Sequence, residues 1–565
     1  MISNDLLWFK ETIFYEVYVR AFADSNGDGI GDLPGLTGRL DYLQDLGVEC
    51  IWLLPISPSP LRDDGYDVAD FTGIHPDYGT LDDLRRLVDQ AHRRGIRVVT
   101  DLVLNHTSDQ NPWFQASRDP SHPDHARYRD WYVWSPTDRR YQETRIIFLD
   151  TERSNWSWDP LRGEYYWHRF FHHQPDLNYD HPAVRQAMLN VVRFWLDQGI
   201  DGFRVDAVPY LYEREGTSCE NLPETHAYLK HLRAFVDQHA PGTLLLSEAN
   251  QWPEETRDYL GDGDEFHMSF HFPLMPRIFL ALAQADSRPI RQILARTPPI
   301  PDSCQWGTFL RCHDELTLEM VSEEERHFLW DHYAPEPRMR LNLGIRRRLA
   351  PLLSGWEDGD HRLDRARVEL AYSLLFSLPG SPFLYYGDEI GMGDNIWLED
   401  RGGVRTPMQW SDAANAGFST AEPGKLFSPV IDDRPYGYRS LNVQAQQADP
   451  GSLLNRVREM IRVRKAHPAL GRGNCTFLGP PGGAVHASSR TVLAYLRTCG
   501  DETILVANNL SSVPQSAELD LADYANRPAS DLFTGAVIAV GEKGTPLAGR
   551  LHLQLRPGEY CWRLL

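Results

Sequence analysis

The sequence predicts an α/β protein: a (β/α)8 TIM barrel with an inserted B domain, a helical lid insert and a C-terminal antiparallel β-sandwich domain. Three observations predict this fold class. Over roughly the first 390 residues, short apolar runs rich in β-branched and aromatic residues alternate with helix-like segments. Two segments of different composition interrupt this alternation. After Cys475, short alternating segments separated by Gly, Pro and Asn replace it, which is typical of an antiparallel β domain.

Eight segments are predicted as barrel strands because each is short, apolar and rich in strand-forming residues. They are residues 13–21, 50–55, 96–104, 202–208, 244–248, 266–270, 307–312 and 382–386. Between several of them lie amphipathic stretches, such as residues 81–93 and 184–196, whose apolar residues recur at helical spacing. A chain of 565 residues exceeds what one hydrophobic core usually supports, so we expect smaller companion domains beside the barrel.

The barrel is expected over residues 1–106 and 180–474. Residues 107–179, dense in Trp, Tyr, His, Asp and Pro, form the predicted B domain, and residues 321–367 form a charged lid subdomain. Both segments leave the C-terminal ends of predicted strands, where barrel enzymes carry out their chemistry. Residues 475–565 form the predicted C-terminal β domain, which carries no cluster of catalytic residue types.

The composition excludes several classes of function. A net charge of −22 disfavours a nucleic-acid partner, because such binding depends on Lys and Arg that neutralise phosphates. No segment is apolar and long enough to span a bilayer, and the N-terminus lacks the basic and apolar regions of a secretory signal. The seven cysteines show no Cys-x-x-Cys spacing, which disfavours zinc or a redox pair. We therefore expect a cytoplasmic protein with no membrane partner and a neutral substrate.

Three acidic residues stand where predicted strands end: Asp206, Glu248 and Asp314. A charged residue at the end of a buried strand costs burial energy unless it is paired or used. On a barrel, all three would meet at one mouth. Any one of them could merely cap a strand, but the three together favour catalysis.

Two of these carboxyl groups suit cleavage of a glycosidic bond with retention of the anomeric configuration. That reaction needs an ionised nucleophile and a protonated acid about 5 Å apart. Arg204 precedes Asp206 by two positions on one predicted strand, so both side chains point to one face and the cation favours an ionised Asp206. Glu248 sits among aliphatic residues, which suits an acid/base. We therefore predict Asp206 as the nucleophile and Glu248 as the acid/base.

These residues stand in segments that resemble the signature regions of the α-amylase family of glycoside hydrolases (family 13), in the same order. The segments are residues 101–106, 202–206, 244–248 and 313–314, and the resemblance covers almost the whole chain. The resemblance implies the same two roles, with Asp314 as the third catalytic carboxylate that holds substrate hydroxyls. It also implies that His106, Arg204 and His313 line the same glucose-binding subsite.

Two further segments resemble substrate-binding loops of that family. In residues 63–67, the resemblance implies that Asp63 grips sugar hydroxyls and that Tyr66 stacks on the ring. Residues 174–178 and 401–410 are similar to the variants found in enzymes of small α-glucosides, and Gln174 and Arg405 are the substrate-binding residues that they contribute. Arg405 is the expected partner of Asp63, with Arg401 as the alternative.

Within the family, residues 8–20, 316–326, 342–351 and 387–395 most resemble members that interconvert maltose and trehalose. This implies a retaining double displacement through a β-glucosyl-enzyme, intramolecular transfer of the glucosyl group, minor hydrolysis to glucose and no organic cofactor. Closed lids would retain the released glucose, with Arg145, Tyr210 and Glu319 near the closure. Maltose and trehalose are the expected small-molecule partners; a homodimer and a maltose kinase in the same pathway are left open.

Two structural metal sites are expected. The loop Asp24, Asn26, Asp28, Ile30 and Asp32 places oxygen donors at alternate positions, as in the first part of an EF-hand, without a Glu at position twelve. Calcium or magnesium could occupy it, and a simple Asp/Asn/Gly turn is the alternative. The resemblance implies a second, calcium site between barrel and B domain. Its ligands would be Asn105, Asp176, Tyr210, Leu211 and Glu213.

Two other functions compete with the interconversion of disaccharides. An α-glucosidase would use the same carboxylates at a mouth open to water, and only the second insert and the closing motifs separate it from a transferase. A non-catalytic barrel, such as the heavy chains of amino-acid transporters, would carry a membrane span and lack the catalytic carboxylates. This sequence has neither of those two properties.

Overall fold

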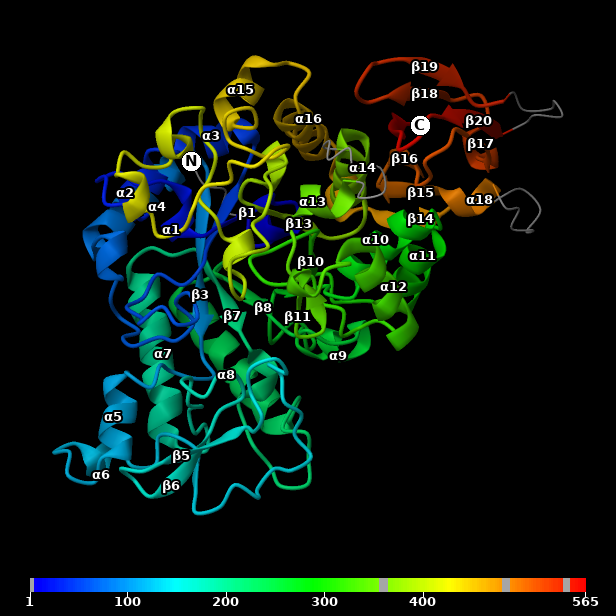
Figure 1. Cartoon of the computed structure of the whole chain (residues 1–565). Helices are drawn as coiled ribbons and strands as arrows, with labels where there is room; N and C mark the ends of the chain where they lie inside the picture. The colour runs from blue at the N-terminus through cyan, green and yellow to red at the C-terminus, as the bar shows by residue number, and fades with distance from the viewer. Residues whose placement is uncertain (1–4, 355–363, 480–487, 542–548) are drawn as a thin grey trace.

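The computed structural model describes residues 5–354, 364–479, 488–541 and 549–565. Eight parallel strands close a barrel in the order β1-β13-β10-β9-β8-β7-β3-β2, which confirms the predicted fold class (Figure 1). The strands are β1 (Phe14–Val17), β2 (Cys50–Leu53), β3 (Arg97–Val103), β7 (Gly202–Asp206), β8 (Leu244–Ser247), β9 (Met268–Phe270), β10 (Gln305–Phe309) and β13 (Ser381–Tyr385). Each overlaps one of the predicted strands. The strand predicted at 307–312 begins and ends earlier, which places Asp314 in the loop after β10.

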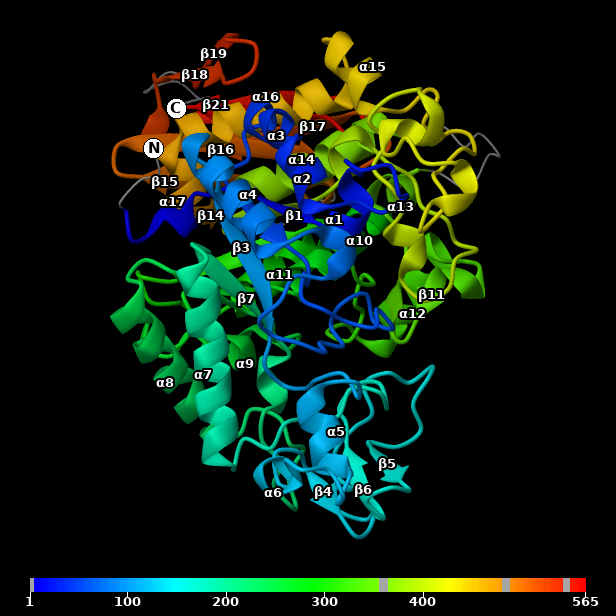
Figure 2. The ribbon, with the colours of Figure 1, turned by 90° about the vertical axis from the view of Figure 1, so that its left-hand side faces the viewer.

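Helices surround the barrel on its outside (Figure 2). Those of the barrel region are α1 (Val19–Phe22), α2 (Leu33–Thr37), α3 (Leu40–Leu46), α4 (Leu81–Arg93), α7 (Pro182–Asp197), α8 (Pro223–His239), α9 (Pro253–Asp258), α10 (Leu274–Gln284), α11 (Arg288–Arg296), α14 (Arg365–Ser377), α15 (Val443–Ala448), α16 (Leu453–Ala466) and α17 (Pro468–Arg472). The helix predicted at residues 81–93 begins after Thr80, whose side chain forms a capping box with Asp83.

The strand register brings charged side chains together at the barrel mouth. Residue 101 on β3 pairs with residue 204 on β7, and residue 103 pairs with Asp206. Gly202 permits β7 to approach β8 closely, because a Cβ at this position would lie 2.6 Å from the Cβ of Leu244. The amide of Glu248 donates to the carbonyl of Val205, so Glu248 stands beside the end of β7.

The B domain projects from the barrel and occupies the lower end of the molecule in both views (Figures 1 and 2). It contains α5 (Pro112–Arg118), α6 (His125–Tyr128) and a small sheet of β4 (Trp134–Ser135), β6 (Glu164–Trp167) and β5 (Trp156–Asp159). Its own apolar cluster includes Val133, Trp156 and Trp167. The aromatic residues of this insert thus build a small core, although the segment looks irregular in sequence.

The second insert is held to the barrel by its arginines. It contains α12 (Glu323–Tyr333), β11 (Arg340–Leu341), β12 (Gly344–Ile345) and α13 (Leu349–Leu353), whereas residues 355–363 of the predicted lid lie outside the described residues. Arg347 and Arg348 are buried and pair with Asp394 and Asp388. Residues 365–367 belong to the barrel helix α14 instead of the insert.

The C-terminal domain is antiparallel, as predicted, and lies at the opposite end of the molecule from the B domain (Figure 1). Its larger sheet contains β14 (Asn474–Phe477), β15 (Val492–Cys499), β16 (Glu502–Asn509), β21 (Tyr560–Leu564), β18 (Pro528–Asp531) and β19 (Val537–Ala539), and the smaller one β17 (Gln515–Asp520) and β20 (Arg550–Leu555). Trp562 donates to Ser373 of α14 at 3.0 Å, which anchors the sheet to the barrel. In the described parts of the chain, no helix is both long and apolar enough to cross a membrane.

Candidate active site

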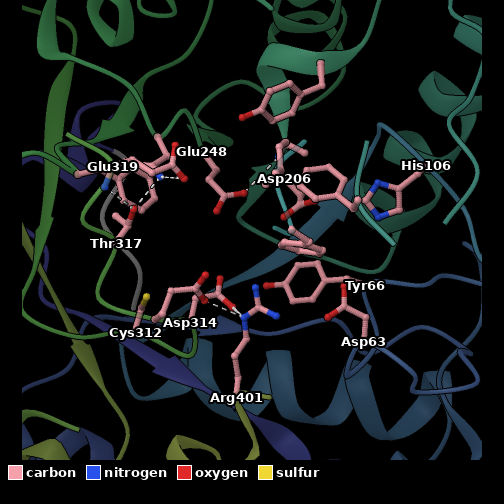
Figure 3. Close-up of a pocket in the computed structure, with 18 residues that line it drawn as sticks. Asp63, Tyr66, His106, Asp206, Glu248, Cys312, Asp314, Thr317, Glu319 and Arg401 are labelled. Atoms are coloured by element: carbon pink, nitrogen blue, oxygen red, sulfur yellow. Dashed lines mark hydrogen bonds and ion pairs between the residues drawn. The ribbon is translucent and has the colours of Figure 1, made fainter. Parts of the chain in front are cut away.

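The three predicted catalytic carboxyl groups line one pocket at the C-terminal ends of the barrel strands (Figure 3). Asp206 is the last residue of β7, Glu248 directly follows β8, and Asp314 lies in the loop after β10. Ala207, the residue after Asp206, has a φ of 53° and turns the chain out of the strand. Its amide donates to Glu248 at 3.2 Å, so this turn also positions the second carboxyl group.

Arg204 joins the two catalytic carboxyl groups. Its Nη1 lies 2.6 Å from Asp206 and 2.7 Å from Asp101, and its Nη2 lies 2.7 Å from Glu248. The prediction assigned this guanidinium to Asp206 alone and placed Glu248 among aliphatic residues. Since both carboxyl groups contact one guanidinium, they stand close together, as retaining cleavage requires.

The pKa values separate the roles of Asp206 and Glu248. Burial raises the pKa of Glu248 to about 8, with Arg204 acting against the shift and Asp206 adding to it. Burial also raises the pKa of Asp206 above its usual value, while Arg204 opposes the shift. Glu248 is therefore the group that carries a proton at neutral pH, which suits an acid.

The activity should depend on pH through these two groups. Glu248 must be protonated to donate, so kcat/KM is expected to fall as the pH rises through about 8. Asp206 must be ionised to attack, so the acid limb should lie above the pKa of about 4 of an unperturbed Asp. Measurements of kcat/KM between pH 4 and 10 test this. The two pKa values that they give are apparent values that belong to Asp206 and Glu248 together. An alkaline limb below pH 6 would contradict it.

Asp314 is held ionised by cations. Burial raises its pKa, but His313 and Arg401 together hold it well below the usual value. His313 contacts Asp314 at 3.1 Å and Glu16 at 2.5 Å. Burial would lower the pKa of His313, but Asp314 and Glu16 raise it to about 9. His313 therefore acts as a cation behind the pocket instead of lining it.

Tyr66, His106 and Asp63 lie together at one end of the pocket (Figure 3). The Tyr66 ring stacks on His313 with centroids 5.5 Å apart, and its hydroxyl lies 2.9 Å from the His313 Nε2. Burial lowers the pKa of His106 to about 3, so its ring is neutral. His106 lines the pocket, but its ring is only 2% exposed and its Nε2 is buried.

Asp63 has Gln174 as its hydrogen-bond partner, and Arg401, the alternative partner expected, lowers its pKa more than Arg405 does. Gln174 donates to Asp63 at 2.7 Å, and burial raises the pKa of Asp63 to about 7. Arg405 instead pairs with the neighbouring Asp64 and with Asp314, and it stands behind the pocket. Arg401 lines the pocket and lies 2.8 Å from Asp314. Arg401 is therefore better placed than Arg405 to meet substrate.

Sequence reasoning assigned no role to several residues of the site. Asp101 lies within a signature segment, but its contact with Arg204 depends on the strand register. Glu16, a single acid in the apolar strand β1, is 1% exposed and holds His313. Asn250 and Thr317 line the pocket from two loops. A charged residue inside an otherwise apolar strand was the available signal for Glu16.

The B domain and the loop after β10 meet across the pocket mouth. Arg145 of the B domain lies 2.6 Å from Glu319 and 2.9 Å from Glu220, and its Nη2 reaches the Tyr210 hydroxyl at 3.5 Å. Asn250 donates to Glu319 at 3.3 Å from the barrel side. Arg145 thus contacts both Tyr210 and Glu319, which line the pocket.

A second contact joins the two inserts. The Asn342 amide donates to Asp150 of the B domain at 2.7 Å, and its side chain donates to Glu315 at 3.1 Å. Glu315 in turn lies 3.0 Å from Arg401. Glu323 and Glu324 at the start of α12 are exposed, so the contacts to the B domain come from Asn342 and from the loop before α12.

Comparisons with known proteins agree with this geometry. Residues 16–327 and 352–473 match the model of the α-amylase catalytic domain, and residues 483–562 match that of the maltogenic amylase C-terminal domain. The chain belongs to the α-amylase family. It is therefore an enzyme whose barrel, B domain and C-terminal sheet are those of that family.

Relatives within the α-amylase family include "Trehalose synthase/amylase" of Mycobacterium tuberculosis, which is 59% identical over 93% of this chain and 86% of its own length. "Trehalose synthase" of Pimelobacter sp. is 56% identical over 96% of this chain and 94% of its own length. Among solved structures, isomaltulose synthase of Klebsiella sp. LX3 superposes with a TM-score of 0.76 at 27% identity and covers 99% of both chains.

The second metal site expected from the α-amylase resemblance contains unpartnered oxygens. Among the described residues, Asn105 Oδ1, Asp176 Oδ2 and Glu213 Oε1 are buried and accept no hydrogen bond. Burial raises the pKa of Asp176 to about 8, and burial together with Asp176 raises that of Glu213 well above its usual value. Buried acceptors without donors are what a cation would satisfy. These three side chains fit a calcium ion.

The Asp24 loop satisfies its own oxygens. Asp24 accepts from the amides of Asn26, Gly27 and Gly29, and Asp28 accepts from the amide of Ile30. Asp32 caps α2 through the Gly35 amide. Within the described chain, no group of three or more His, Cys, Asp or Glu side chains is arranged to hold a metal. A cation at this loop stays a prediction.

Proposed function

We propose that this enzyme interconverts maltose and trehalose by intramolecular glucosyl transfer, with minor hydrolysis to glucose. The observation that carries the proposal is the pair of contacts across the pocket mouth, Arg145 with Glu319 and Asn342 with Asp150, above a retaining pair of carboxyl groups. The relatives named trehalose synthase support the same reaction. Maltose and trehalose are accordingly the proposed small-molecule partners.

The first half of the reaction forms a covalent intermediate. The Asp206 carboxylate attacks the anomeric carbon of the non-reducing glucose of maltose, and the bond from that carbon to O4 breaks. Glu248 transfers its proton to the departing O4. Asp314, Arg401 and His106 are placed to hold hydroxyl groups of the same ring. The products of this step are a β-glucosyl-enzyme and a free glucose.

The second half depends on confinement of the free glucose. The glucose turns and presents its anomeric hydroxyl to the intermediate, and Glu248, now ionised, accepts the proton of that hydroxyl. The new oxygen–carbon bond displaces Asp206 and gives the α,α-1,1 linkage of trehalose. Water in place of glucose would give hydrolysis, so the contacts at the mouth decide the outcome.

Incubation of the pure protein with maltose alone tests the proposal. Trehalose is expected to accumulate well ahead of glucose when the products are resolved over time. If glucose were the main product, the enzyme would be an α-glucosidase, the alternative that shares these carboxylates. Incubation with trehalose alone should yield maltose, since both directions pass through the same intermediate.

A calcium ion is proposed at Asn105, Asp176 and Glu213, with the carbonyls of Tyr210 and Leu211 as further ligands. The ion would be structural, because cleavage by two carboxyl groups needs no metal. It would supply the positive charge that these buried oxygens lack and join the B domain to the loop after β7. A cytoplasmic location, a homodimer, a maltose kinase in the same pathway and a cation at the Asp24 loop stay predictions.

Calcium should stabilise the protein. At a free concentration 100 times the Kd, one bound ion adds about 2.7 kcal/mol to the free energy of unfolding. The gain should be larger at pH 8 than at pH 6, because the ion binds the deprotonated carboxyl groups. Thermal melts in calcium and in chelator measure it. Asp176→Asn should remove the part of the shift that this site contributes, and Asp28→Asn, in the Asp24 loop, should keep that part. Equal Tm values of the native protein in calcium and in chelator would contradict the site.

A further inference from the structure

Glu16 is a buried carboxyl group within the barrel sheet. It is the third residue of β1, it pairs in register with Trp52 on β2 and Tyr385 on β13, and it is 1% exposed. A carboxylate in such a place costs free energy unless other groups compensate its charge. The neutral amide of glutamine would fill the same space at a lower cost, so a carboxylate here indicates that its charge is used.

The partner of Glu16 is His313. One carboxylate oxygen, Oε1, accepts from the backbone amide of His313 at 3.0 Å and from its Nδ1 at 2.5 Å. On the other side of the ring, Nε2 lies 3.1 Å from Asp314 and 2.9 Å from the Tyr66 hydroxyl. The imidazole ring therefore connects a carboxylate behind the pocket with a carboxylate that lines it.

Both carboxylate contacts of the ring are hydrogen bonds only if the ring is charged. A neutral imidazole carries one N–H, whereas an imidazolium carries two. With its Nδ1–H directed at Glu16, a neutral His313 would present the lone pair of Nε2 to the Asp314 carboxylate, which is repulsive. Burial would lower the pKa of His313, but Asp314 and Glu16 raise it to about 9, so the ring donates from both nitrogens at neutral pH.

The charge of His313 also sets the direction of the Tyr66 hydroxyl. Beside a charged ring, this oxygen accepts from Nε2 and from Arg204 Nη1 at 3.4 Å, and its own proton is donated to Asp101 at 3.3 Å. Beside a neutral ring, that proton would turn to Nε2, and Asp101 would lose a donor. Asp101 and Asp206 share Nη1 of Arg204, so the charge of the ring affects the contacts of the nucleophile.

Among the described residues, few groups around the ring titrate near neutral pH. Burial raises three pKa values well above their usual ranges, so these groups stay protonated: Tyr66, Cys312 and Tyr385. Arg405, which donates to the His313 carbonyl at 2.9 Å, is always charged. Burial raises the pKa of Asp101 to about 6, while Arg204 and His313 oppose the shift. A change at Glu16 should therefore act mainly through the protonation of His313.

We propose that Glu16 is a positioning residue of the reaction: its charge keeps His313 an imidazolium that donates to Asp314. The inference rests on the proposed function, because it requires retaining cleavage with Asp314 on the hydroxyl groups of the reacting ring. Hydrogen bonds to the hydroxyl group beside the anomeric carbon strengthen in the transition state. Loss of the Glu16 charge should therefore lower kcat more than it changes KM.

Glu16→Gln tests the inference, because the amide carbonyl can accept the same two hydrogen bonds without the charge. At neutral pH, kcat for total maltose consumption should fall about ten- to hundredfold, the effect of losing a hydrogen bond between charged groups. Without the Glu16 charge, His313 should titrate near its usual pKa of about 6.5. The deficit relative to the native enzyme should therefore shrink as the pH falls below that value, whereas structural damage alone would give the same deficit at every pH.

The charge of His313 can also be observed directly. With ¹⁵N-labelled histidine, nuclear magnetic resonance of the native enzyme at neutral pH should show two protonated ring nitrogens for His313, and Glu16→Gln should show one. Comparison with His313→Asn assigns the signals. This measurement needs no turnover, and the spectrum of the native enzyme alone can contradict the inference if Glu16→Gln folds poorly.

Glu389→Gln is the matched control. Glu389 is another buried glutamate, 0% exposed, and it accepts from the hydroxyl of Tyr15, the neighbour of Glu16 on β1, at 2.8 Å. The hydrogen bonds that it accepts come from neutral phenols, Tyr15 and Tyr42, so removal of its charge does not change the hydrogen bonds of His313. This variant should keep the native pH profile even if its melting temperature falls as far as that of Glu16→Gln.

Two results would overturn the inference. One is a His313 ring with a single N–H in the native enzyme at neutral pH, and the other is a Glu16→Gln variant whose kcat equals the native value or falls equally at every pH. The identity of the products is scored separately in the same assay. If glucose is the main product, the proposed interconversion is refuted, but the pH dependence of total maltose consumption still reports on Glu16.

Discussion

Asp206→Ala should abolish both trehalose formation and glucose release from maltose. The expected loss in kcat is on the order of 10⁴-fold or more, because no covalent intermediate can form without the carboxylate. Chromatography of products after prolonged incubation measures the residual rate. Glu323→Gln, at an exposed carboxyl group of α12, is the matched control and should retain full activity.

The stereochemistry of rescue separates the nucleophile from the acid/base. With α-glucosyl fluoride and azide, Asp206→Ala should give β-glucosyl azide, because azide enters from the face that the carboxylate occupied and fluoride leaves without a proton. Glu248→Ala should give α-glucosyl azide, since Asp206 still forms the intermediate. If the two variants exchanged products, the assigned roles would be reversed.

Arg145→Ala should convert much of the transfer into hydrolysis. Loss of the ion pair with Glu319 opens the mouth beside Glu248, so water competes with the confined glucose. The ratio of glucose to trehalose formed from maltose is expected to rise by about tenfold or more, while total maltose consumption changes by only a few fold. Time courses with both products quantified measure the ratio.

Arg338→Ala is the matched control for the mouth. Arg338 belongs to the second insert, and its guanidinium lies 3.8 Å above the exposed Trp397 ring, a contact outside the pocket. This variant should keep the native product ratio. An unchanged ratio in Arg145→Ala would show that the ion pair does not exclude water, and confinement would then have to come from Asn342 and Asp150.

Prediction from the sequence worked best for charged residues at the ends of buried strands, because burial of a carboxyl group is costly unless it is paired or used. Asp206, Glu248 and Asp314 end apolar runs, and a barrel brings strand ends together, so the pocket could be assembled before any coordinates. The division of Arg204 among three carboxyl groups could not, because it depends on the pairing of residue 101 with residue 204. Arg405 pairs with Asp64 instead of the expected Asp63. The two residues differ by one position in a loop, and the sequence alone does not determine which of them the guanidinium contacts.

The role of the second insert was only partly predictable. Its charges suggested a lid, but helical periodicity does not say which face meets a neighbouring domain. In the structure, Glu325 caps α12 and pairs with Arg277, while Arg347 pairs with Asp394. The residues that reach the mouth are Glu319 and Asn342, which lie in loops without regular spacing.

The position of Arg204 has a consequence for the energy of the reaction. Before attack, with Asp101 and Asp206 ionised and Glu248 protonated, the cluster of one guanidinium and three carboxyl groups carries a net charge of −1. In the intermediate, Asp206 is a neutral ester and Glu248 is ionised, so the sum is again −1. The negative charge moves from Asp206, which contacts Nη1 of Arg204, to Glu248, which contacts Nη2 of the same guanidinium. Surrounding dipoles therefore need little rearrangement during turnover, in either direction of the reaction.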